Sequence, residues 1–433
     1  MGIKIAVIGG ASSYTPELFD NLVDFSEQFD VDEVVLMDLN SEKLNFIASV
    51  CERLLEKSTL NINLSTTGQV DEAVAGADFV VLQIRVGGLD ARVRDENVPM
   101  ALDMIGNETT GAGGFACALR TVPVALDIAQ KIEQIAPRAW LLNLSNPAGI
   151  VTEALLNHSQ VRSLGFCNIP INTTYALAEA LEADPEHIRL DSFGLNHLSW
   201  SRAVYVDGEE RLQPLIERTL DRDSLLYRSG LVESLIDPQW LKTLCMIPSW
   251  YARYFYYPEK ILELDRQESQ TRGHEDMLSE SQLGDIYKTT GYGKEAKDIL
   301  KAKGGAQYYL PVLQVIESMV KDRGDIITVD TVNGDTLPDL PPHVCVEVPA
   351  KIYRDRIEPL PIGPMPLNVR GLVQIVKTYE ELTVQSAITG DHEVAIAALM
   401  ANPLVGSYAK ARQYFNRVLE NERSYIPQFF GPD

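Results

Sequence analysis

Two short polar stretches, each directly after an apolar strand-like run, hold residues whose types could bind a metal ion. Cys167 opens the stretch CNIPIN, and His197 closes the stretch GLNH. Thiolate and neutral imidazole are both good ligands for a divalent transition metal. Two protein ligands leave coordination positions open, as a catalytic metal needs and a structural metal does not. Either residue alone has a simpler interpretation, because a single cysteine after an apolar strand is usually a small buried hydrophobic side chain.

The first apolar run, residues 3–8, leads into a turn of small residues with the sequence GGASSYTPEL. A strand, such a turn and a helix that begins with Thr15 and Pro16 form the layout of a dinucleotide-binding site. A carboxylate after the second strand accepts hydrogen bonds from ribose hydroxyls and favours NAD over NADP. The strict G-x-G-x-x-G pattern is absent, so a plain strand–helix turn is the alternative. The predicted cofactor-binding residues are Gly9, Gly10, Ser12, Ser13 and Asp38.

Three further stretches carry polar or glycine-rich patterns near the ends of predicted strands. Residues 85–96 (RVGGLDARVRDE) hold three arginines that could bind a phosphate or carboxylate, or form local ion pairs at a helix start. Residues 106–114 (GNETTGAGG) could approach a ligand closely or simply turn the chain. Asn146, in NLSNPAG, could offer a donor and an acceptor to a sugar diol or merely cap a helix.

The elements that must position these residues alternate between strand and helix over the first 200 residues. Such alternation predicts a parallel sheet covered on both faces, with ligands beyond the carboxyl ends of the strands. Strands are predicted at residues 3–8, 33–37, 79–84, 140–144 and 163–166, and helices at residues 16–29, 41–57, 119–135 and 148–157.

The predicted fold class is α/β: a Rossmann-like, doubly wound parallel sheet with a second α+β lobe. We place an NAD-binding domain at residues 1–200 and a substrate-binding and oligomerisation domain at residues 201–433. The polar segment 265–303 is predicted to be a mobile excursion near the site. In the second domain a smaller sheet among long helices is predicted from strand-like runs at residues 203–206, 326–331, 343–348 and 353–357.

Composition narrows the possible partners. The formal net charge of −23 argues against nucleic acid and anionic membrane surfaces, because both require basic patches. No apolar run approaches the roughly 18–20 residues of a membrane span, and the N-terminus lacks a signal-peptide layout. Five scattered cysteines do not form a disulfide framework. These features favour a cytoplasmic protein.

Taken together, the motifs resemble glycoside hydrolase family 4, most closely its bacterial 6-phospho-β-glucosidases. The resemblance covers nearly the whole chain. It rests on eight motifs in order: GGASSYTPEL, RVGGLDARVRDE, GNETTGAGG, NLSNPAG, CNIPIN, GLNH, PSWY and KGGAQYY. This family is the NAD-dependent exception among glycosidases.

The resemblance implies hydrolysis of a 6-phospho-β-glucoside by a redox route. NAD⁺ takes hydride from C3 of the sugar, a base removes the acidified proton on C2, the aglycone is eliminated, water adds, and the hydride returns. A divalent metal, typically Mn²⁺, polarises the C2 and C3 oxygens. The implied first lobe is also similar to lactate and malate dehydrogenases. The implied substrate is a phosphorylated disaccharide or β-glucoside, and the implied assembly is a homodimer or homotetramer.

Residue by residue, the resemblance implies Cys167 and His197 as metal ligands and Tyr251 as the base. A phenol would need the metal or a cation such as Arg253 to react near neutral pH. Arg92 and Asn146 match substrate-binding positions.

Two other positions bear on the substrate. Asn168 matches a substrate and catalytic position where α-acting relatives tend to carry Asp. An amide cannot protonate a leaving group, so β-linked substrates are favoured. Lys303 stands where an Arg commonly precedes Gly-Gly-Ala, and Lys offers a point charge rather than a bidentate fork.

Three alternatives stay open at this point. The chain could be a net NAD-dependent dehydrogenase, although no His beside an Asp suggests their proton relay. It could be a non-catalytic, NAD-responsive binder of sugar phosphates. It could also keep the chemistry and act on a 6-phospho-α-glucoside, a galactoside or a uronide.

Overall fold

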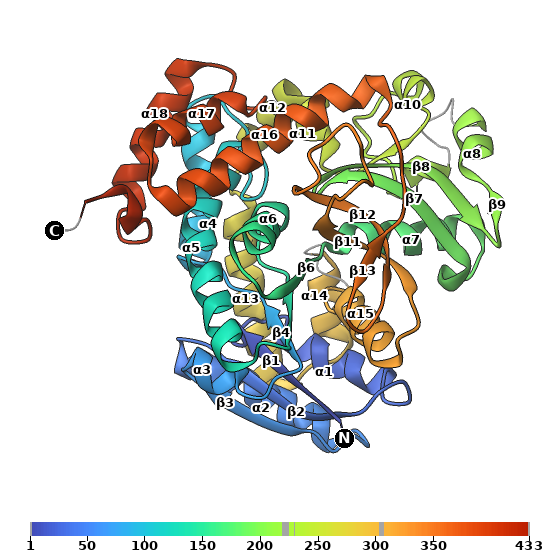
Figure 1. Cartoon of the computed structure of the whole chain (residues 1–433), viewed down its shortest axis with the longest axis vertical. Coiled ribbons are helices and arrows are strands. Elements are labelled where there is room, and N and C mark those ends of the chain that lie inside the picture. Colours follow the sequence, from blue (N-terminus) through green and yellow to red (C-terminus); the bar gives the residue numbers. More distant parts are fainter. Residues whose placement is uncertain (1, 219–224, 229, 303–306, 432–433) are drawn as a thin grey trace.

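The computed structural model describes residues 2–218, 225–228, 230–302 and 307–431. Within these residues the largest sheet has nine strands, and its first six, all parallel, follow the order β3-β2-β1-β4-β5-β6 (Figure 1). This is the strand order of a dinucleotide-binding Rossmann fold. The predicted fold class is confirmed. The parallel strands are β1 (Ile3–Ile8), β2 (Val31–Met37), β3 (Asn63–Thr67), β4 (Phe79–Leu82), β5 (Trp140–Asn143) and β6 (Arg162–Gly165).

Strand β3 was not predicted. It lies at the edge of the sheet and none of its five residues is buried, so it carries no apolar run that could reveal it.

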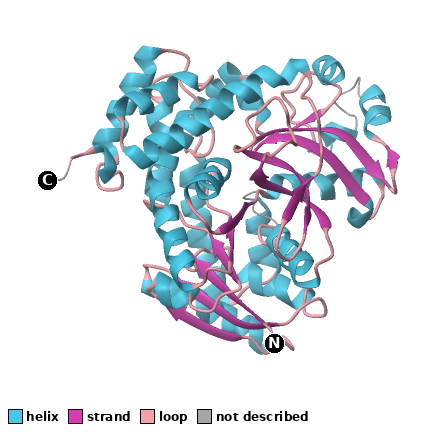
Figure 2. Ribbon diagram, viewed as in Figure 1, coloured by secondary structure: helices cyan, strands magenta, loops and turns pink. Residues whose placement is uncertain are grey.

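Helices cover both faces of the sheet, as Figure 2 shows. Side chains alternate between faces along each strand: Ile5 and Val7 pack in one core cluster, Ala6 and Ile8 in the other. The first cluster includes residues from these helices: α1 (Thr15–Asp24), α2 (Ser41–Glu56), α13 (Arg272–Thr289), α14 (Lys294–Ala302) and α15 (Leu310–Lys321). The second includes residues from α3 (Val70–Val74), α5 (Gly111–Ile135), α6 (Ala148–His158), α16 (Leu367–Thr389), α17 (His392–Ala401) and α18 (Tyr408–Asn421).

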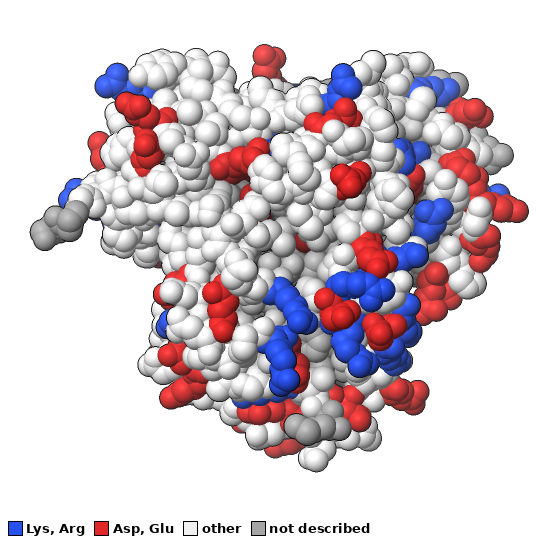
Figure 3. Space-filling model, in the orientation of Figure 1, with Lys and Arg blue, Asp and Glu red and all other residues white. Residues whose placement is uncertain are grey.

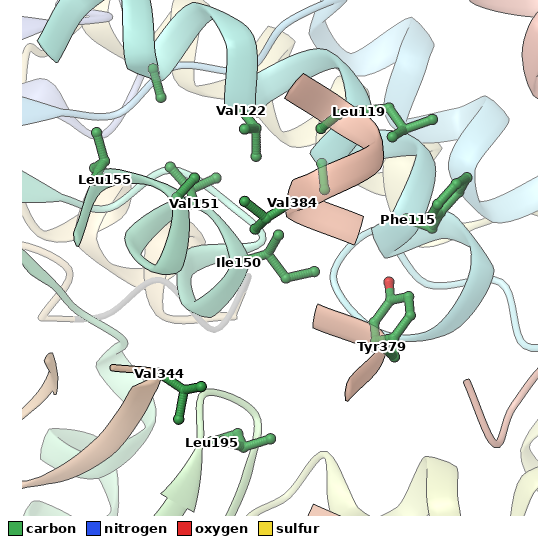
Figure 4. Packing of buried hydrophobic residues seen from close by; sticks show 14 of the residues in the cluster. Phe115, Leu119, Val122, Ile150, Val151, Leu155, Leu195, Val344, Tyr379 and Val384 are labelled. Carbon is green, nitrogen blue, oxygen red and sulfur yellow. The ribbon is translucent and has the colours of Figure 1, made fainter. Parts of the chain in front are cut away.

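Figure 4 shows the second cluster where α5, α6 and α16 meet. Each large apolar side chain buried there contributes about 1.5–3 kcal/mol. This packing holds α16, which comes from the C-terminal part of the chain, against the helices that flank the site. The labelled residues of the three helices are Phe115, Leu119, Val122, Ile150, Val151, Leu155, Tyr379 and Val384.

The prediction of a separate smaller sheet is wrong for three of its four strands. β11 (Asp325–Val332), β12 (Cys345–Ile352) and β13 (Ile357–Pro359) extend the Rossmann sheet antiparallel beyond β6. Gly165 permits this approach, because a Cβ there would lie 2.9 Å from Asp330 on β11. A strand pattern reveals a strand but not its partner. The division into domains at residue 200 stays a prediction.

A second sheet carries one edge of the site. It contains β7 (Ile188–Leu195), β8 (Leu198–Val206), β9 (Glu209–Glu210) and β10 (Ile247–Pro248). β7 and β8 form a tight hairpin in which Leu195 pairs with Leu198. The remaining helices are α4 (Gly88–Met100), α7 (Asn168–Leu181), α8 (Leu212–Arg218), α9 (Leu225–Arg228), α10 (Pro238–Leu244), α11 (Ala252–Tyr256) and α12 (Pro258–Gln267).

Two sequence-based expectations need correction here. The segment expected to be an excursion supplies α13 and α14 over residues 265–302, and apolar residues of both helices pack on the sheet. One helix, α5, is long and apolar enough to cross a membrane, although no such segment was expected. Its apolar window is 78% buried inside the protein, as in the core helix of a globular domain.

Candidate active site

The predicted nucleotide turn follows β1 and is fixed against the end of β2. Gly9 N and Gly10 N both donate to the carbonyl of Met37, at 2.9 and 2.8 Å. Gly9 has φ +91°, and a Cβ there would lie 2.5 Å from the carbonyl oxygen of Gln83. Only glycine fits such a turn without strain. The carboxylate of Asp38 accepts from Ala11 N at 3.2 Å.

The two predicted serines of this turn have structural contacts. The hydroxyl of Ser12 accepts from Tyr14 N at 3.3 Å, and the carbonyl of Ser13 accepts from the Tyr287 hydroxyl at 2.8 Å. All five predicted cofactor-binding residues therefore lie together, at the carboxyl edge of the sheet where α1 begins. This is where a Rossmann fold binds a pyrophosphate.

The two predicted metal ligands meet. Cys167 follows β6 and caps α7, and its sulfur accepts from Ile169 N at 3.4 Å. His197 lies in the β7–β8 turn, where its backbone adopts φ +64°. The distance from Cys167 Sγ to His197 Nε2 is 3.3 Å. One ion can contact both atoms at that separation.

The electrostatics of this pair suit a cation. Burial lowers the pKa of His197 to about 3, which keeps the imidazole neutral and able to donate a lone pair. Burial also raises the pKa of the Cys167 thiol, and the carboxylates of Glu347 and Asp330 act in the same direction. A bound cation would offset that effect and favour the thiolate. Among the described residues no group of three or more His, Cys, Asp or Glu forms a complete metal cage. Cys167 Sγ and His197 Nε2 are thus the two donors at which a divalent metal could bind.

Tyr251 lies directly on the imidazole of His197. The two rings stack with centroids 3.7 Å apart and planes 7° apart. The loop before α11 is held on the β7–β8 hairpin, because Ser249 N donates to Ser199 O at 2.8 Å and Ser249 Oγ accepts from Tyr251 N at 3.3 Å. The predicted base thus lies beside the predicted metal ligands.

Arg253, the cation that the sequence suggested as a possible aid to Tyr251, contacts other aromatic side chains. The Arg253 guanidinium stacks on Trp250, 3.3 Å from its ring centroid, and donates to the Tyr254 hydroxyl at 3.2 Å. Burial raises the pKa of the Tyr251 phenol, whereas the positive charge of Arg92 lowers it. Because burial is the larger effect, Tyr251 needs a bound cation to lose its proton near neutral pH.

Arg92 lies in α4 within a cluster of five charged side chains, which we call the arginine cluster. Its Nε donates to Glu96 at 3.0 Å, and its Nη1 lies 3.1 Å from Glu108 and contacts Asp276. Arg85 forms an ion pair with the other oxygen of Glu108. Two guanidinium groups therefore face three carboxylates. Only Arg92–Glu96 is a local ion pair of the kind that one interpretation expected, because Glu108 and Asp276 come from other segments. Any anion that binds here must compete with these carboxylates.

The remaining predicted substrate residues are placed less tightly. Asn168 is the first residue of α7, and its Oδ1 lies 3.9 Å from Cys167 Sγ. It therefore adjoins the two predicted metal ligands, Cys167 and His197, which we call the metal pair. Asn146 follows β5, and its carbonyl accepts from Cys117 Sγ at 3.5 Å. Lys303 lies outside the described residues.

Sequence reasoning missed the residues that hold the metal pair. The loop GNETTGAGG was singled out for its glycines, yet Gly113 and Gly114 only let α5 approach the backbone of that loop. Its polar residues face the site instead: the Thr109 hydroxyl lies 3.0 Å from His197 Nδ1. Asp276 contacts Arg92, 184 residues away, and Glu347 accepts from Asn196, 151 residues away. No local signal in the sequence marked either carboxylate.

A small cavity of about 30 Å³ lies behind His197. It separates the β7–β8 turn from α16, and its polar lining includes Thr109, Asn196, Glu380 and Asn402. Asn196 also donates to Glu347 at 3.1 Å, which ties the turn to β12.

Two protein-family models together match most of the chain. Residues 4–183 match the model of family 4 glycosyl hydrolases, and residues 192–405 match the C-terminal domain of the same family. The chain is 37% identical to a probable 6-phospho-beta-glucosidase of Bacillus subtilis over 99% of its length and 98% of the relative.

Solved structures give the same result. The 6-phospho-beta glucosidase of Thermotoga maritima, solved with manganese, NAD+ and glucose-6-phosphate, has a TM-score of 0.89 at 30% identity, covering 98% of this chain and 99% of that one. A 6-phospho-alpha-glucosidase from gut microorganisms, in complex with NAD and Mn2+, has a TM-score of 0.88 at 25% identity, covering 99% and 100%. Malate dehydrogenase from Plasmodium falciparum shares the fold alone, at 15% identity, a TM-score of 0.52 and coverage of 89% and 98%. The chain belongs to glycosyl hydrolase family 4.

Proposed function

We propose that this protein hydrolyses 6-phospho-β-glucosides with the help of NAD and a divalent metal such as Mn²⁺. The observation that carries the proposal is the stack of Tyr251 on His197, with Cys167 Sγ 3.3 Å from the imidazole. This arrangement brings two soft metal ligands and a phenol into one corner of a nucleotide-binding fold. The similar Thermotoga maritima enzyme, which holds manganese, NAD+ and glucose-6-phosphate in its structure, supports the choice of cofactors and sugar.

Bound at these sites, NAD and the metal would supply a reversible oxidation at C3 of the sugar and a positive charge beside the C2 and C3 oxygens. The residues of the chain do the rest. The phenolate oxygen of Tyr251 accepts the proton from C2, and the phenol can return it later. Cys167 and His197 hold the metal. Gly9, Gly10, Ser12, Ser13 and Asp38 hold the dinucleotide.

Substrate binding is assigned to Arg92, Asn146 and Asn168, which the structure describes, and to Lys303. Arg92 has the charge to attract the anionic sugar, and Asn146 can donate to one sugar hydroxyl and accept from another. Lys303 would add a cation for the phosphate.

The preference for a β-linkage rests on Asn168. This residue adjoins the metal cysteine, where a carboxylic acid could protonate a departing oxygen and an amide cannot. The similar Bacillus subtilis protein, named a probable 6-phospho-beta-glucosidase, supports this choice. The similar 6-phospho-alpha-glucosidase structure makes an α-linked substrate the second candidate.

We further propose a cytoplasmic homodimer or homotetramer. Exposed apolar side chains on α16 and α17 would be available for contacts between subunits. They are Leu367, Ile375, Ile388 and Met400.

The deciding experiment measures hydrolysis of nitrophenyl α- and β-glycosides, with and without a 6-phosphate, in NAD⁺, Mn²⁺ and a thiol reductant. We expect the 6-phospho-β-glucoside to react fastest, with no net NADH at 340 nm. Activity that is independent of NAD⁺, or NADH that accumulates in step with substrate, would contradict the proposal. Faster reaction of the α-anomer would favour the second candidate.

A further inference from the structure

The hydroxyl of Thr109 joins the glycine-rich loop to a predicted metal ligand. Its Oγ1 lies 2.9 Å from Asn107 Oδ1 on one side and 3.0 Å from His197 Nδ1 on the other. The side chain also forms a hydrogen bond with the Tyr251 phenol, whose O–H can donate to one lone pair of the Thr109 hydroxyl. A hydroxyl has one hydrogen to donate and two lone pairs that accept. Which neighbour receives that hydrogen therefore decides where the proton of His197 lies.

The orientation of the Asn107 amide answers the question. Its Oδ1 accepts from Thr109 N at 2.9 Å and from Thr110 N at 3.0 Å. A backbone N–H can only donate, so the atom that faces both must be the amide oxygen and not the nitrogen. The amide nitrogen points the other way, toward the Tyr254 hydroxyl at 3.1 Å.

Because Asn107 Oδ1 cannot donate, the Thr109 hydroxyl donates to it and keeps only lone pairs for His197. We propose that Thr109 is a positioning residue that holds His197 as the Nδ1–H tautomer, leaving the lone pair of Nε2 beside Cys167 Sγ. The Nδ1–H donates to Thr109 at 3.0 Å, and Nε2 lies 3.3 Å from the sulfur.

Two contacts then fix the orientation of the His197 ring. The face-to-face stack with Tyr251 sets the plane of the imidazole. Rotation of the ring by 180° within a similar plane would keep that stack but would remove the nitrogen that faces Thr109. The hydroxyl thus selects one of the two ring orientations and one of the two tautomers, as outer partners of metal-binding histidines commonly do.

The tautomer is a property of the metal-free protein, so it can be measured without substrate. We suggest long-range ¹H–¹⁵N correlation spectra of protein labelled with ¹⁵N-histidine, with a His197→Gln variant to assign the resonance. We expect wild-type His197 to be protonated at Nδ1. A wild-type ring protonated at Nε2 would overturn the proposal, whatever happens to the variants.

The variants test whether Thr109 is the cause. Thr109→Val replaces the hydroxyl by a methyl group of similar size, and we expect a mixture of tautomers. Thr109→Ser keeps the hydroxyl and should restore Nδ1–H. Thr383→Val is the control, because Thr383 is a buried threonine whose hydroxyl donates only within α16, to Tyr379 O at 2.7 Å. An unchanged tautomer in Thr109→Val would contradict the proposal.

The consequence for metal binding rests on the proposed function. Equilibrium dialysis with Mn²⁺ alone should show about 10–100-fold weaker binding in Thr109→Val, with Thr109→Ser and Thr383→Val close to wild type. Wild-type affinity in Thr109→Val would contradict a positioning role. Absence of Mn²⁺ binding in the wild type would count against the proposed function, while the tautomer spectra would still decide the inference about Thr109.

Discussion

The metal pair and the arginine cluster satisfy their polar groups in opposite ways. Cys167 and His197 are neutral donors that face each other across 3.3 Å. In the arginine cluster, each carboxylate of Glu96, Glu108 and Asp276 already contacts a guanidinium group. One region has lone pairs to offer to a metal, whereas the other has its charges already paired.

The difference indicates how each region would respond to a ligand. A cation entering the metal pair would gain two ligands and break no ion pair. An anion approaching Arg92 must compete with three carboxylates, which weakens the net gain. Figure 3 shows that acidic and basic side chains are also interspersed on the face it presents.

Removal of the thiolate should have the largest effect. Cys167→Ser is expected to weaken Mn²⁺ binding by more than about 100-fold, beyond the usual loss for an outer partner, and to abolish activity. Calorimetry and hydrolysis assays check this, and the melting temperature of the metal-free protein should stay near that of wild type. Cys245→Ser is the matched control, because Cys245 is exposed. Turnover at the wild-type rate in Cys167→Ser with Mn²⁺ would remove the metal pair from the comparison.

Loss of the proposed base comes next. Tyr251→Phe keeps the ring that stacks on His197 and deletes the hydroxyl. We expect kcat to fall by roughly 10²–10⁴ with little change in KM. Tyr257→Phe, in the same aromatic run, is the control, because its hydroxyl contacts Asp237 N. Retained activity in Tyr251→Phe, together with no effect of deuterium at C2 of the substrate, would mean that Tyr251 is not the base.

The arginine cluster should show a smaller and more selective effect. Arg92→Ala is expected to raise KM for a phosphorylated substrate by about 10–100-fold, the worth of a charge-assisted contact, with a smaller change for the neutral analogue. The melting temperature should also fall, because buried carboxylates lose their partner. Asp276→Asn is the counterpart: it removes a competing carboxylate and should lower KM for the phosphorylated substrate. Equal losses on both substrates in Arg92→Ala would show that Arg92 does not bind the phosphate.

The smallest effect concerns a buried carboxyl that forms no ion pair within the described residues. Glu17 in α1 accepts from Tyr308 N at 2.9 Å, and burial raises its pKa to about 7. A raised carboxyl pKa means that the folded state favours the protonated form. Its stabilisation is therefore complete below the unfolded pKa of about 4.3 and is lost as pH rises through about 7.

Glu17→Gln tests this, because it keeps the shape and removes the titration. Between pH 4.5 and pH 8, the free energy of unfolding of the variant should rise relative to that of wild type by about 3 kcal/mol. For a chain of this size, that corresponds to roughly 3 °C in apparent melting temperature. Parallel melting curves of the two proteins over that pH range would contradict the assignment. Such a result would mean that burial does not raise the pKa of Glu17.

Much of the fold could be predicted because it depends on local patterns. The apolar runs around Ile5, Leu36, Val81, Leu142 and Leu164 alternate with amphipathic helices, and a parallel sheet is the arrangement that buries both. The metal pair could be predicted for the same reason. Cys167 follows a strand of the Rossmann sheet, at the edge where such folds bind ligands, and His197 follows β7 of the second sheet. Both strands are apolar runs, which are local signals.

The partners of these residues depended on the tertiary structure. Cys167, His197 and Tyr251 could be singled out as candidate metal ligands and base from the sequence, because residue types and motifs are local properties. Only the folded chain placed Thr109 behind His197, Asp276 against Arg92, and β11 beside β6. The two side-chain contacts join residues that are 88 positions apart for Thr109 and His197, and 184 positions apart for Arg92 and Asp276. Contacts at such separations arise from the packing of whole elements, and no periodicity within one segment encodes which distant segment it will meet.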